Sequence, residues 1–217
     1  MALIIFDFDG VLADTLDDML RFGQEVCDEL GVKHTVIKTD LSNLEVMSFV
    51  TYGRACEVPE HLLDEFVQRC LKRFAEKTSP PEIFDGLGDI VRQLAVDHKI
   101  AVITSNSSPV VNAFLSEHGL DACVDVVYGV EYPGSKAHKI TKVRQQLTAG
   151  AGQAPVFMVG DSLSDMYAAK EAGVISIAVT WGHQSLEILL RGNPDYVISS
   201  PDELIELIEQ KNVRAGF

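Results

Sequence analysis

Two aspartates, Asp7 and Asp9, stand where an apolar run near the start of the chain ends. Residues 3–6 (LIIF) are uncharged and favour β structure, which predicts a strand buried on both faces of a parallel sheet. If the backbone stays extended to Asp9, both carboxylates lie on one side and Phe8 on the other. Two carboxylates so close repel each other unless a cation or a shared proton lies between them. The alternative is an ordinary turn, since Asp and Gly10 are common turn residues.

Polar side chains also follow later apolar runs of the chain. They are Thr104, Ser105 and Asn106 after the second predicted strand, Lys136 at the start of the helix after the third, and Asp161 and Asp165 after the fourth. Each alone is explained by a helix cap, a turn or a solvated charge. The carboxyl ends of parallel strands meet at one edge of a sheet, so together these groups are expected to converge there.

The chemistry of this set points to phosphoryl transfer. Carboxylates such as Asp7 and Asp161 suit Mg²⁺, which prefers oxygen ligands and keeps water or substrate phosphate as the others. A hydroxyl, loop amides and one lysine suit the oxygens of a phosphoryl group. The sequence therefore predicts a magnesium and phosphate site at the edge of the sheet.

The elements expected to position this site form an α/β fold: a Rossmann-like parallel sheet with helices on both faces and an inserted small helical domain. Residues 1–14 and 83–217 are assigned to the α/β core and residues 15–82 to the helical insertion. Three helices are expected in the insertion, over residues 16–30, 39–53 and 59–74. Later strands are expected at residues 100–104, 124–128, 155–160, 174–179 and 196–198, separated by helices.

Composition limits the classes of partner. The chain has 217 residues, 47% of them hydrophobic, and a formal net charge of −14. This charge argues against general binding to nucleic acid or to anionic membranes, because both would be repelled. No stretch approaches the roughly 20 apolar residues that cross a bilayer, and the start lacks a secretory signal pattern. A cytoplasmic protein is expected.

The four cysteines show no metal-binding pattern along the chain. Cys27, Cys56, Cys70 and Cys123 have no C-x-x-C spacing and no nearby histidine partner that would suggest a zinc site. We expect buried, reduced thiols.

Four segments together resemble the motifs of the haloacid dehalogenase superfamily. They are residues 7–15 (DFDGVLADT), residues 103–106 (ITSN), Lys136 and residues 160–165 (GDSLSD). The chain is most similar to the phosphoglycolate-phosphatase-like branch, subfamily I, which has a helical C1 cap after the first strand. The resemblance covers essentially the whole chain and implies a phosphatase with the fold described above.

The resemblance implies roles for the four aspartates. Asp7 would be the nucleophile that forms an aspartyl-phosphate. Asp9 would protonate the leaving alcohol and then activate the hydrolytic water. Mg²⁺ would be held by the Asp7 carboxylate, the Asp9 backbone carbonyl and Asp161, with Asp165 as an outer or alternative ligand.

The phosphate-binding residues follow from the same resemblance. Thr104, Ser105, Asn106 and Lys136 would bind the phosphoryl oxygens, and Lys136 would also restrain the nucleophile. The family lysine is usually followed by proline, whereas alanine follows here. Lys139 therefore stays open as an alternative.

Three further residues are weighed against plain structural interpretations. Arg54 is a candidate for a substrate anion, although a solvated surface arginine would look the same in sequence. His138 is interpreted as a surface residue. Trp181, in a Trp-Gly-His segment that resembles a family loop, is interpreted as packing.

The leading hypothesis is a Mg²⁺-dependent phosphatase acting on a small phosphorylated metabolite, with 2-phosphoglycolate as a candidate and a monomer or homodimer as the expected form. One alternative is a sugar-phosphate mutase like β-phosphoglucomutase on the same scaffold. A haloacid dehalogenase is disfavoured because that branch lacks the second aspartate. A phospho-accepting signalling module uses similar residues but lacks the helical insertion.

Overall fold

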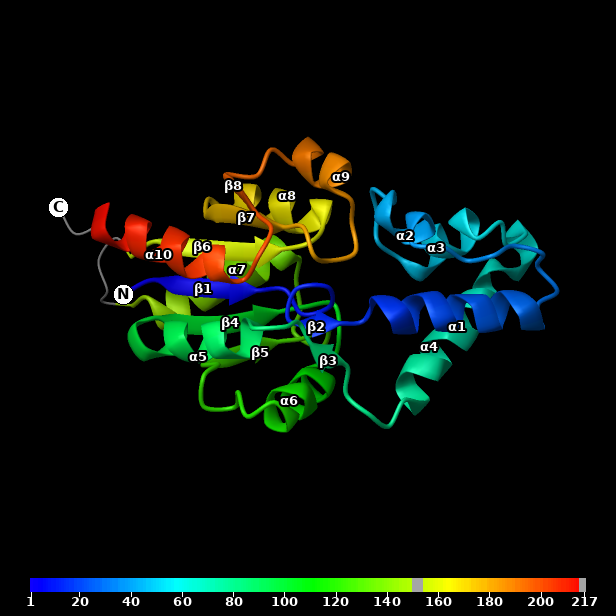
Figure 1. Ribbon diagram of the computed structural model, residues 1–217, viewed down its shortest axis with the longest axis horizontal. Helices are drawn as coiled ribbons and strands as arrows, with labels where there is room; N and C mark the ends of the chain where they lie inside the picture. The colour runs from blue at the N-terminus through cyan, green and yellow to red at the C-terminus, as the bar shows by residue number, and fades with distance from the viewer. Residues whose placement is uncertain (150–153, 215–217) are drawn as a thin grey trace.

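The computed structural model describes the backbone of residues 1–149 and 154–214 and the side chains up to residue 211, outside that gap. Its centre is a six-stranded parallel sheet in the order β5-β4-β1-β6-β7-β8 (Figure 1). The strands are β1 (Leu3–Phe6), β4 (Lys99–Ile103), β5 (Val126–Tyr128), β6 (Val156–Gly160), β7 (Ile175–Val179) and β8 (Tyr196–Ile198). The first strand of the chain thus lies in the middle of the sheet, and the predicted α/β fold class is confirmed.

Helices cover both faces of the sheet, as a fully apolar first strand requires. Along β1, Ile4 and Phe6 belong to an apolar cluster with helices α5 (Leu87–Asp97), α6 (Ser108–Glu117) and α10 (Asp202–Arg214). Leu3 and Ile5 face the other cluster, which includes α7 (Lys136–Leu147) and α8 (Leu163–Ala172). All four β1 residues are 0% exposed. This burial on both sides fixes the strand that carries Asp7.

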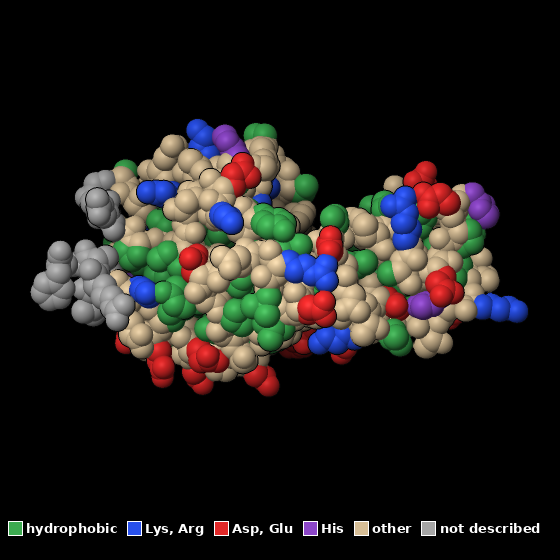
Figure 2. All heavy atoms as spheres, turned by 90° about the horizontal axis from the view of Figure 1, so that it is seen from above, with side chains coloured by type: hydrophobic (Ala, Val, Ile, Leu, Met, Phe, Trp, Pro, Cys, Tyr) green, Lys and Arg blue, Asp and Glu red, His purple; other side chains and the backbone are tan. Residues whose placement is uncertain are grey.

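The helical insertion packs around an apolar cluster of its own. It contains α1 (Leu16–Glu29), α2 (Thr39–Ser42), α3 (Phe49–Ala55), the short 3-10 helix η1 (Glu60–Leu62) and α4 (Leu63–Glu76). Two short antiparallel strands, β2 (Ala13–Asp14) and β3 (Glu82–Ile83), join it to the core. Figure 2 shows a notch between the two parts. We propose that the chain divides at these two strands into a core of residues 1–14 and 83–217 and an insertion of residues 15–82.

The structure corrects one helix of the insertion. The single helix expected over residues 39–53 is two helices, α2 and α3, separated by residues 43–48. The Ser48 side chain accepts a hydrogen bond from the Thr51 backbone and starts α3 with a capping box. The strands β2 and β3 and the helix α9 (Leu186–Arg191) were not predicted.

Among the described residues, no helix is long and apolar enough to span a membrane.

Candidate active site

Three neighbouring strands end at the same edge of the sheet, and each is followed by a predicted site residue. Phe6 of β1 pairs with Val102 of β4 and with Val159 of β6. Asp7 follows the first of these strands directly, while Thr104 and Asp161 follow the other two. Residues about 100 and 150 positions apart in sequence are thereby brought to one edge, as the parallel topology predicts.

The turn after β1 departs from the extended geometry expected for Asp9. The Phe8 carbonyl accepts hydrogen bonds from the backbone N–H groups of residues 11, 12 and 13, which folds the chain back immediately. These bonds form a turn, so the condition that the backbone stays extended to Asp9 is not met. Gly10 has φ of 76°, and a Cβ there would collide with the Asp161 carboxylate. Glycine is needed for both its conformation and this close approach.

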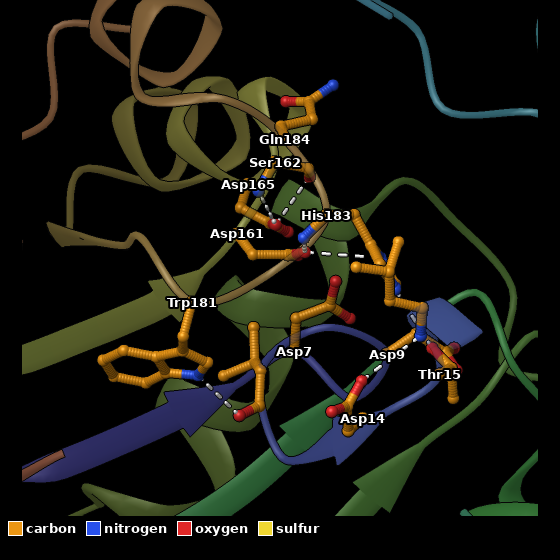
Figure 3. Close-up of polar contacts among 12 residues, drawn as sticks. Asp7, Asp9, Asp14, Thr15, Asp161, Ser162, Asp165, Trp181, His183 and Gln184 are labelled. Carbon is orange, nitrogen blue, oxygen red and sulfur yellow. Dashed lines mark hydrogen bonds and ion pairs between the residues drawn. The ribbon is translucent and has the colours of Figure 1, made fainter. Parts of the chain in front are cut away.

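An acidic cluster lies at the centre of this edge. Oxygen atoms of Asp7, Asp161 and Asp165 all lie within 4.8 Å of one another, and the residues are only 9%, 2% and 0% exposed. Burial, reinforced by the neighbouring carboxylates, raises the pKa of Asp7 to about 8 and that of Asp161 to about 7. Figure 3 shows the Asp7 carboxylate pointing toward the other two. Near neutral pH such a cluster favours protons or a cation.

Lys136 supplies positive charge to the cluster from the first turn of α7. Its Nζ lies 3.0 Å from Asp7 Oδ2 and 2.5 Å from Asp165 Oδ1. Burial opposes the charge, but the carboxylates outweigh it and raise the pKa of Lys136. Lys139, the alternative lysine, instead donates to the Gly129 carbonyl at 2.7 Å. Of the two lysines, the structure brings Lys136 to the nucleophile candidate.

Asp165 is held by groups on both of its oxygens. Oδ1 pairs with Lys136, and Oδ2 accepts from the backbone N and the hydroxyl of Ser162 at 3.1 and 2.6 Å. The two residues form the capping box that begins α8. Asp165 is therefore better placed to orient Lys136 from behind the metal ligands than to bind a metal ion itself.

Asp9 has different surroundings from the acidic cluster. Its Oδ2 accepts from the Asn106 side chain at 3.2 Å. Burial raises the pKa of Asp9, although His183, Asn106 and Thr15 act in the opposite direction. A partly buried carboxyl with a raised pKa is suited to donate a proton and later accept one.

The segment after β4 forms a tight polar loop. Thr104 is 2% exposed, and its hydroxyl accepts from the Asn106 backbone N at 2.9 Å. Asn106 Oδ1 in turn accepts from the Ser107 backbone at 2.8 Å, whereas Ser105 is exposed. The loop is therefore fixed by its own side chains and leads toward Asp9 through Asn106.

His183 is a site residue that the sequence interpretation missed. Its backbone N donates to Asp161 Oδ2 at 2.7 Å, and its ring nitrogen Nε2 lies 3.1 Å from the Thr15 hydroxyl. A side chain at the preceding Gly182 would collide with Asp161. The rule used for the other strand ends, applied to the polar residues after β7, would have pointed to this loop (Figure 3).

The same loop connects the core to the helical insertion. Gln184, 2% exposed, accepts from the Leu163 backbone and donates to the Leu44 carbonyl, both at 2.5 Å. The Ser185 backbone N donates to the Ser42 carbonyl at 2.8 Å. The interruption between α2 and α3 thus faces the loop that holds Asp161.

The three residues weighed above lie as follows. Arg54 pairs with Glu60 at 2.7 Å within the insertion, and both side chains are exposed. His138 is exposed. Trp181 packs against the core cluster and donates its ring N–H to the Val11 carbonyl at 3.2 Å.

The donor set of the acidic cluster fits a hard divalent cation. Its three ligands offer carboxylate oxygen only, and their mutual repulsion is relieved when a cation is bound. Asp7 and Asp161 are the residues that could hold such an ion most directly, since Asp165 is engaged by Lys136 and Ser162.

Comparison with known proteins gives consistent findings. A family model described as haloacid dehalogenase-like hydrolase matches residues 4–179. A phosphoglycolate phosphatase from Synechococcus elongatus is 28% identical over 97% of this chain and 98% of its own length. A 5'-nucleotidase from Pseudomonas aeruginosa is 26% identical over 95% of each chain.

A solved structure has the same fold. A haloacid dehalogenase-like family hydrolase from Streptococcus pneumoniae superimposes with a TM-score of 0.80 at 23% identity, covering 95% of this chain and 98% of that one.

Proposed function

We propose that this chain, which belongs to the haloacid dehalogenase-like hydrolase family, is a Mg²⁺-dependent phosphatase that cleaves small phosphomonoesters through an aspartyl-phosphate on Asp7. The observation that carries the proposal is the buried cluster of Asp7, Asp161 and Asp165 with Lys136 at 3.0 Å from Asp7. Buried charge of this density is costly and is typical of sites that do chemistry.

Asp7 performs the first step in this proposal. Its carboxylate oxygen attacks phosphorus, a bond forms between that oxygen and the phosphoryl group, and the bond to the leaving alcohol oxygen breaks. The attacking group must be ionised, and the positive charge of Lys136 favours that form. The same contact restrains the carboxylate for in-line approach.

Asp9 manages the protons of both steps. Its raised pKa favours the protonated form, which delivers a proton to the leaving oxygen. As a carboxylate it then takes a proton from water, whose oxygen attacks phosphorus and releases Asp7. The hydrogen bond from Asn106 at 3.2 Å orients the group for both tasks.

The phosphoryl oxygens are bound by the rim of the site. Lys136, the Thr104 hydroxyl and the Ser105 backbone N–H are the donors in this proposal. The backbone N–H groups of Thr104 and Asn106 are already hydrogen-bonded within the protein. Bound Mg²⁺ supplies the positive charge that lets an anionic carboxylate approach an anionic phosphate ester. Asp7, the Asp9 backbone carbonyl and Asp161 would hold it, with Asp165 behind them.

We propose 2-phosphoglycolate as the first substrate to test, because relatives that align over nearly the whole chain are named phosphoglycolate phosphatase. The nucleotidase relative makes nucleoside monophosphates a second class for the substrate panel. Both names describe hydrolysis, which supports transfer to water over transfer to a sugar. A cytoplasmic location and a monomeric or homodimeric state stay predictions.

The proposal is tested by phosphate release from a panel of phosphorylated metabolites, with Mg²⁺ and with excess EDTA. Asp7→Asn should lower kcat by roughly 10⁴-fold or more, because no other group replaces the nucleophile. Asp85→Asn, an exposed carboxylate of the core, is the matched control and should be normal. Mass spectrometry of acid-quenched wild type should detect phosphorylation on Asp7.

Three outcomes would contradict the proposal. Normal turnover by Asp7→Asn would exclude Asp7 as the nucleophile. Full activity in EDTA would exclude a required metal ion. Conversion of glucose 1-phosphate to glucose 6-phosphate without phosphate release would identify a mutase instead.

A further inference from the structure

We propose that the helical insertion holds a second metal site, for a zinc-type divalent cation, formed by His34, Asp40 and Cys56. One ligand atom from each, a ring nitrogen, a carboxylate oxygen and a thiol sulfur, lies within 4.8 Å of the other two. The three residues come from different elements: the loop after α1, helix α2 and the residue that ends α3. This site is separate from the acidic cluster and does not depend on the proposed phosphatase function.

The spacing is close to what a tetrahedral zinc ion needs. Bonds of about 2.0 to 2.3 Å separate neighbouring ligand atoms by roughly 3.3 to 3.8 Å. His34 Nε2 and Asp40 Oδ2 are 2.9 Å apart and hydrogen-bonded, so a cation would enter between them and replace that bond. Side-chain adjustments of about an ångström complete the geometry. Binding displaces the Cys56 thiol proton to solvent.

Two of the ligands are already held in place by their surroundings. Asp40 Oδ2 also accepts from the Ile37 backbone N at 2.8 Å. Gln24 of α1 pins the loop that carries His34: it donates to the His34 carbonyl at 3.2 Å and accepts from the Val36 backbone at 2.8 Å. Such supporting bonds fix the orientation of ligands and strengthen metal binding.

Cys27 places a second sulfur beside the site. Cys27 and Cys56 are both 0% exposed and belong to the same buried cluster of the insertion. Cys27 can serve as a fourth ligand or as a hydrogen-bond donor to the bound Cys56 sulfur. Either role completes the shell of a closed, structural type of site.

The ion has a route to the site from solvent. The side chains of His34 and Asp40 are 17% and 11% exposed, and His34 lines an open surface cavity of about 540 Å³. Cys56 closes the site from the inside of the insertion. A bound ion would tie together the loop after α1, α2 and α3.

The donor atoms distinguish this site from the one on the sheet edge. Sulfur and imidazole nitrogen favour Zn²⁺ and Co²⁺ over Mg²⁺, whereas the all-oxygen cluster of Asp7 favours Mg²⁺. The two sites can therefore be filled and measured separately in the same protein.

The test is a titration of the full-length, reduced and metal-free protein with Co²⁺ in excess Mg²⁺. We expect a thiolate-to-cobalt charge-transfer band that saturates at one Co²⁺ per chain and disappears when Zn²⁺ is added. With free Zn²⁺ about 100-fold above its Kd, we expect Tm to rise by roughly 5 °C or more.

The controls separate ligation from folding. The double variant Cys27→Ser/Cys56→Ser and the single variant His34→Gln should lose the band. Cys70→Ser, a buried thiol of the insertion outside the site, should keep it. Unchanged far-ultraviolet circular dichroism and a cooperative thermal unfolding transition show that the variants fold. The inference is overturned if no band forms up to about 1 mM Co²⁺, or if the folded His34→Gln variant retains it.

Discussion

The sheet edge and the helical insertion use charged side chains in opposite ways. At the edge, Asp7 and Asp165 are 9% and 0% exposed and share one lysine. On the insertion, Arg73 pairs with Glu25 and Glu29, whose side chains are each 45% exposed. Water screens the second group but not the first, so ion pairs on the insertion contribute little to stability. Charge that a fold buries at a cost indicates chemistry, whereas solvated charge indicates a surface.

Among the variants that compare these two regions, Asp9→Asn is expected to have the largest effect, because it removes the proposed proton donor at the sheet edge. We expect kcat to fall by about 10²- to 10⁴-fold with little change in metal binding, because both chemical steps lose proton transfer. Steady-state rates and Mg²⁺ titrations measure this. Asp14→Asn, which alters an exposed carboxylate close by, is the control. Equal losses in the two variants would break the distinction between buried and solvated charge.

Lys136→Met tests the energetic side of the comparison. The change leaves Asp7 and Asp165 without their cation, and breaking a buried pair costs about 3–5 kcal/mol. Urea unfolding of metal-free protein should show this loss. Arg73→Met on the insertion should lower the free energy of unfolding much less. Similar losses in the two variants would mean that burial does not make the Lys136 ion pairs contribute more to stability than the exposed Arg73 pairs.

Gln184→Leu tests the contact between the two regions. The substitution leaves the Leu163 N–H and the Leu44 carbonyl without partners, which costs about 1–3 kcal/mol. We expect KM to rise more than kcat falls, because the insertion would be less firmly held over the site. Gln145→Leu, at an exposed glutamine of α7, should change neither quantity. An unaltered Tm in Gln184→Leu would show that this contact does not hold the insertion to the core.

The stability of the metal-free protein should depend on pH, with a smaller effect than the substitutions above and with a definite sign. The pKa of Asp7 is raised to about 8 and that of Asp161 to about 7, so the folded state keeps protons that the unfolded state has released. Stability should therefore fall as pH rises from about 5.5 to about 8. We expect Tm to drop by a few degrees across this range.

Two comparisons isolate that effect. The raised pKa of His34, due to its bond with Asp40, gives a trend of the same sign. Asp161→Asn reduces the contribution of the acidic cluster to the slope of Tm against pH and leaves that of His34 unchanged. Saturating Mg²⁺ favours the ionised carboxylates and should also flatten this slope. An equally steep slope in Asp161→Asn would show that the cluster is not its source.

The smallest effect is expected from Arg54→Ala. Arg54 pairs with Glu60 in an exposed position, so we expect KM to change by about twofold or less. A rise of tenfold or more with unchanged kcat would instead establish Arg54 as a substrate-binding residue. Glu60→Gln provides the comparison, because it frees the same guanidinium without removing it.

Local patterns in the sequence determined the type and order of most elements. Alternating apolar runs and helical periodicity predicted the parallel sheet, and polar residues at strand ends predicted which side chains would meet. The exceptions are short or interrupted elements. The helix expected over residues 39–53 is divided because Ser48 caps a new helix. The turn at Phe8 replaces an extended backbone because three N–H groups share one carbonyl.

Tertiary structure alone decided the contacts that join distant segments. Loop packing brought His183 to Asp161, and the start of α7 pointed Lys136 rather than Lys139 at Asp7. Spacing along the chain gave no sign of a zinc site, yet the fold brings together the thiol, imidazole and carboxylate within 4.8 Å. Periodicity and capping depend on residues a few positions apart. Convergence depends on how whole helices and strands pack, and no local pattern encodes that.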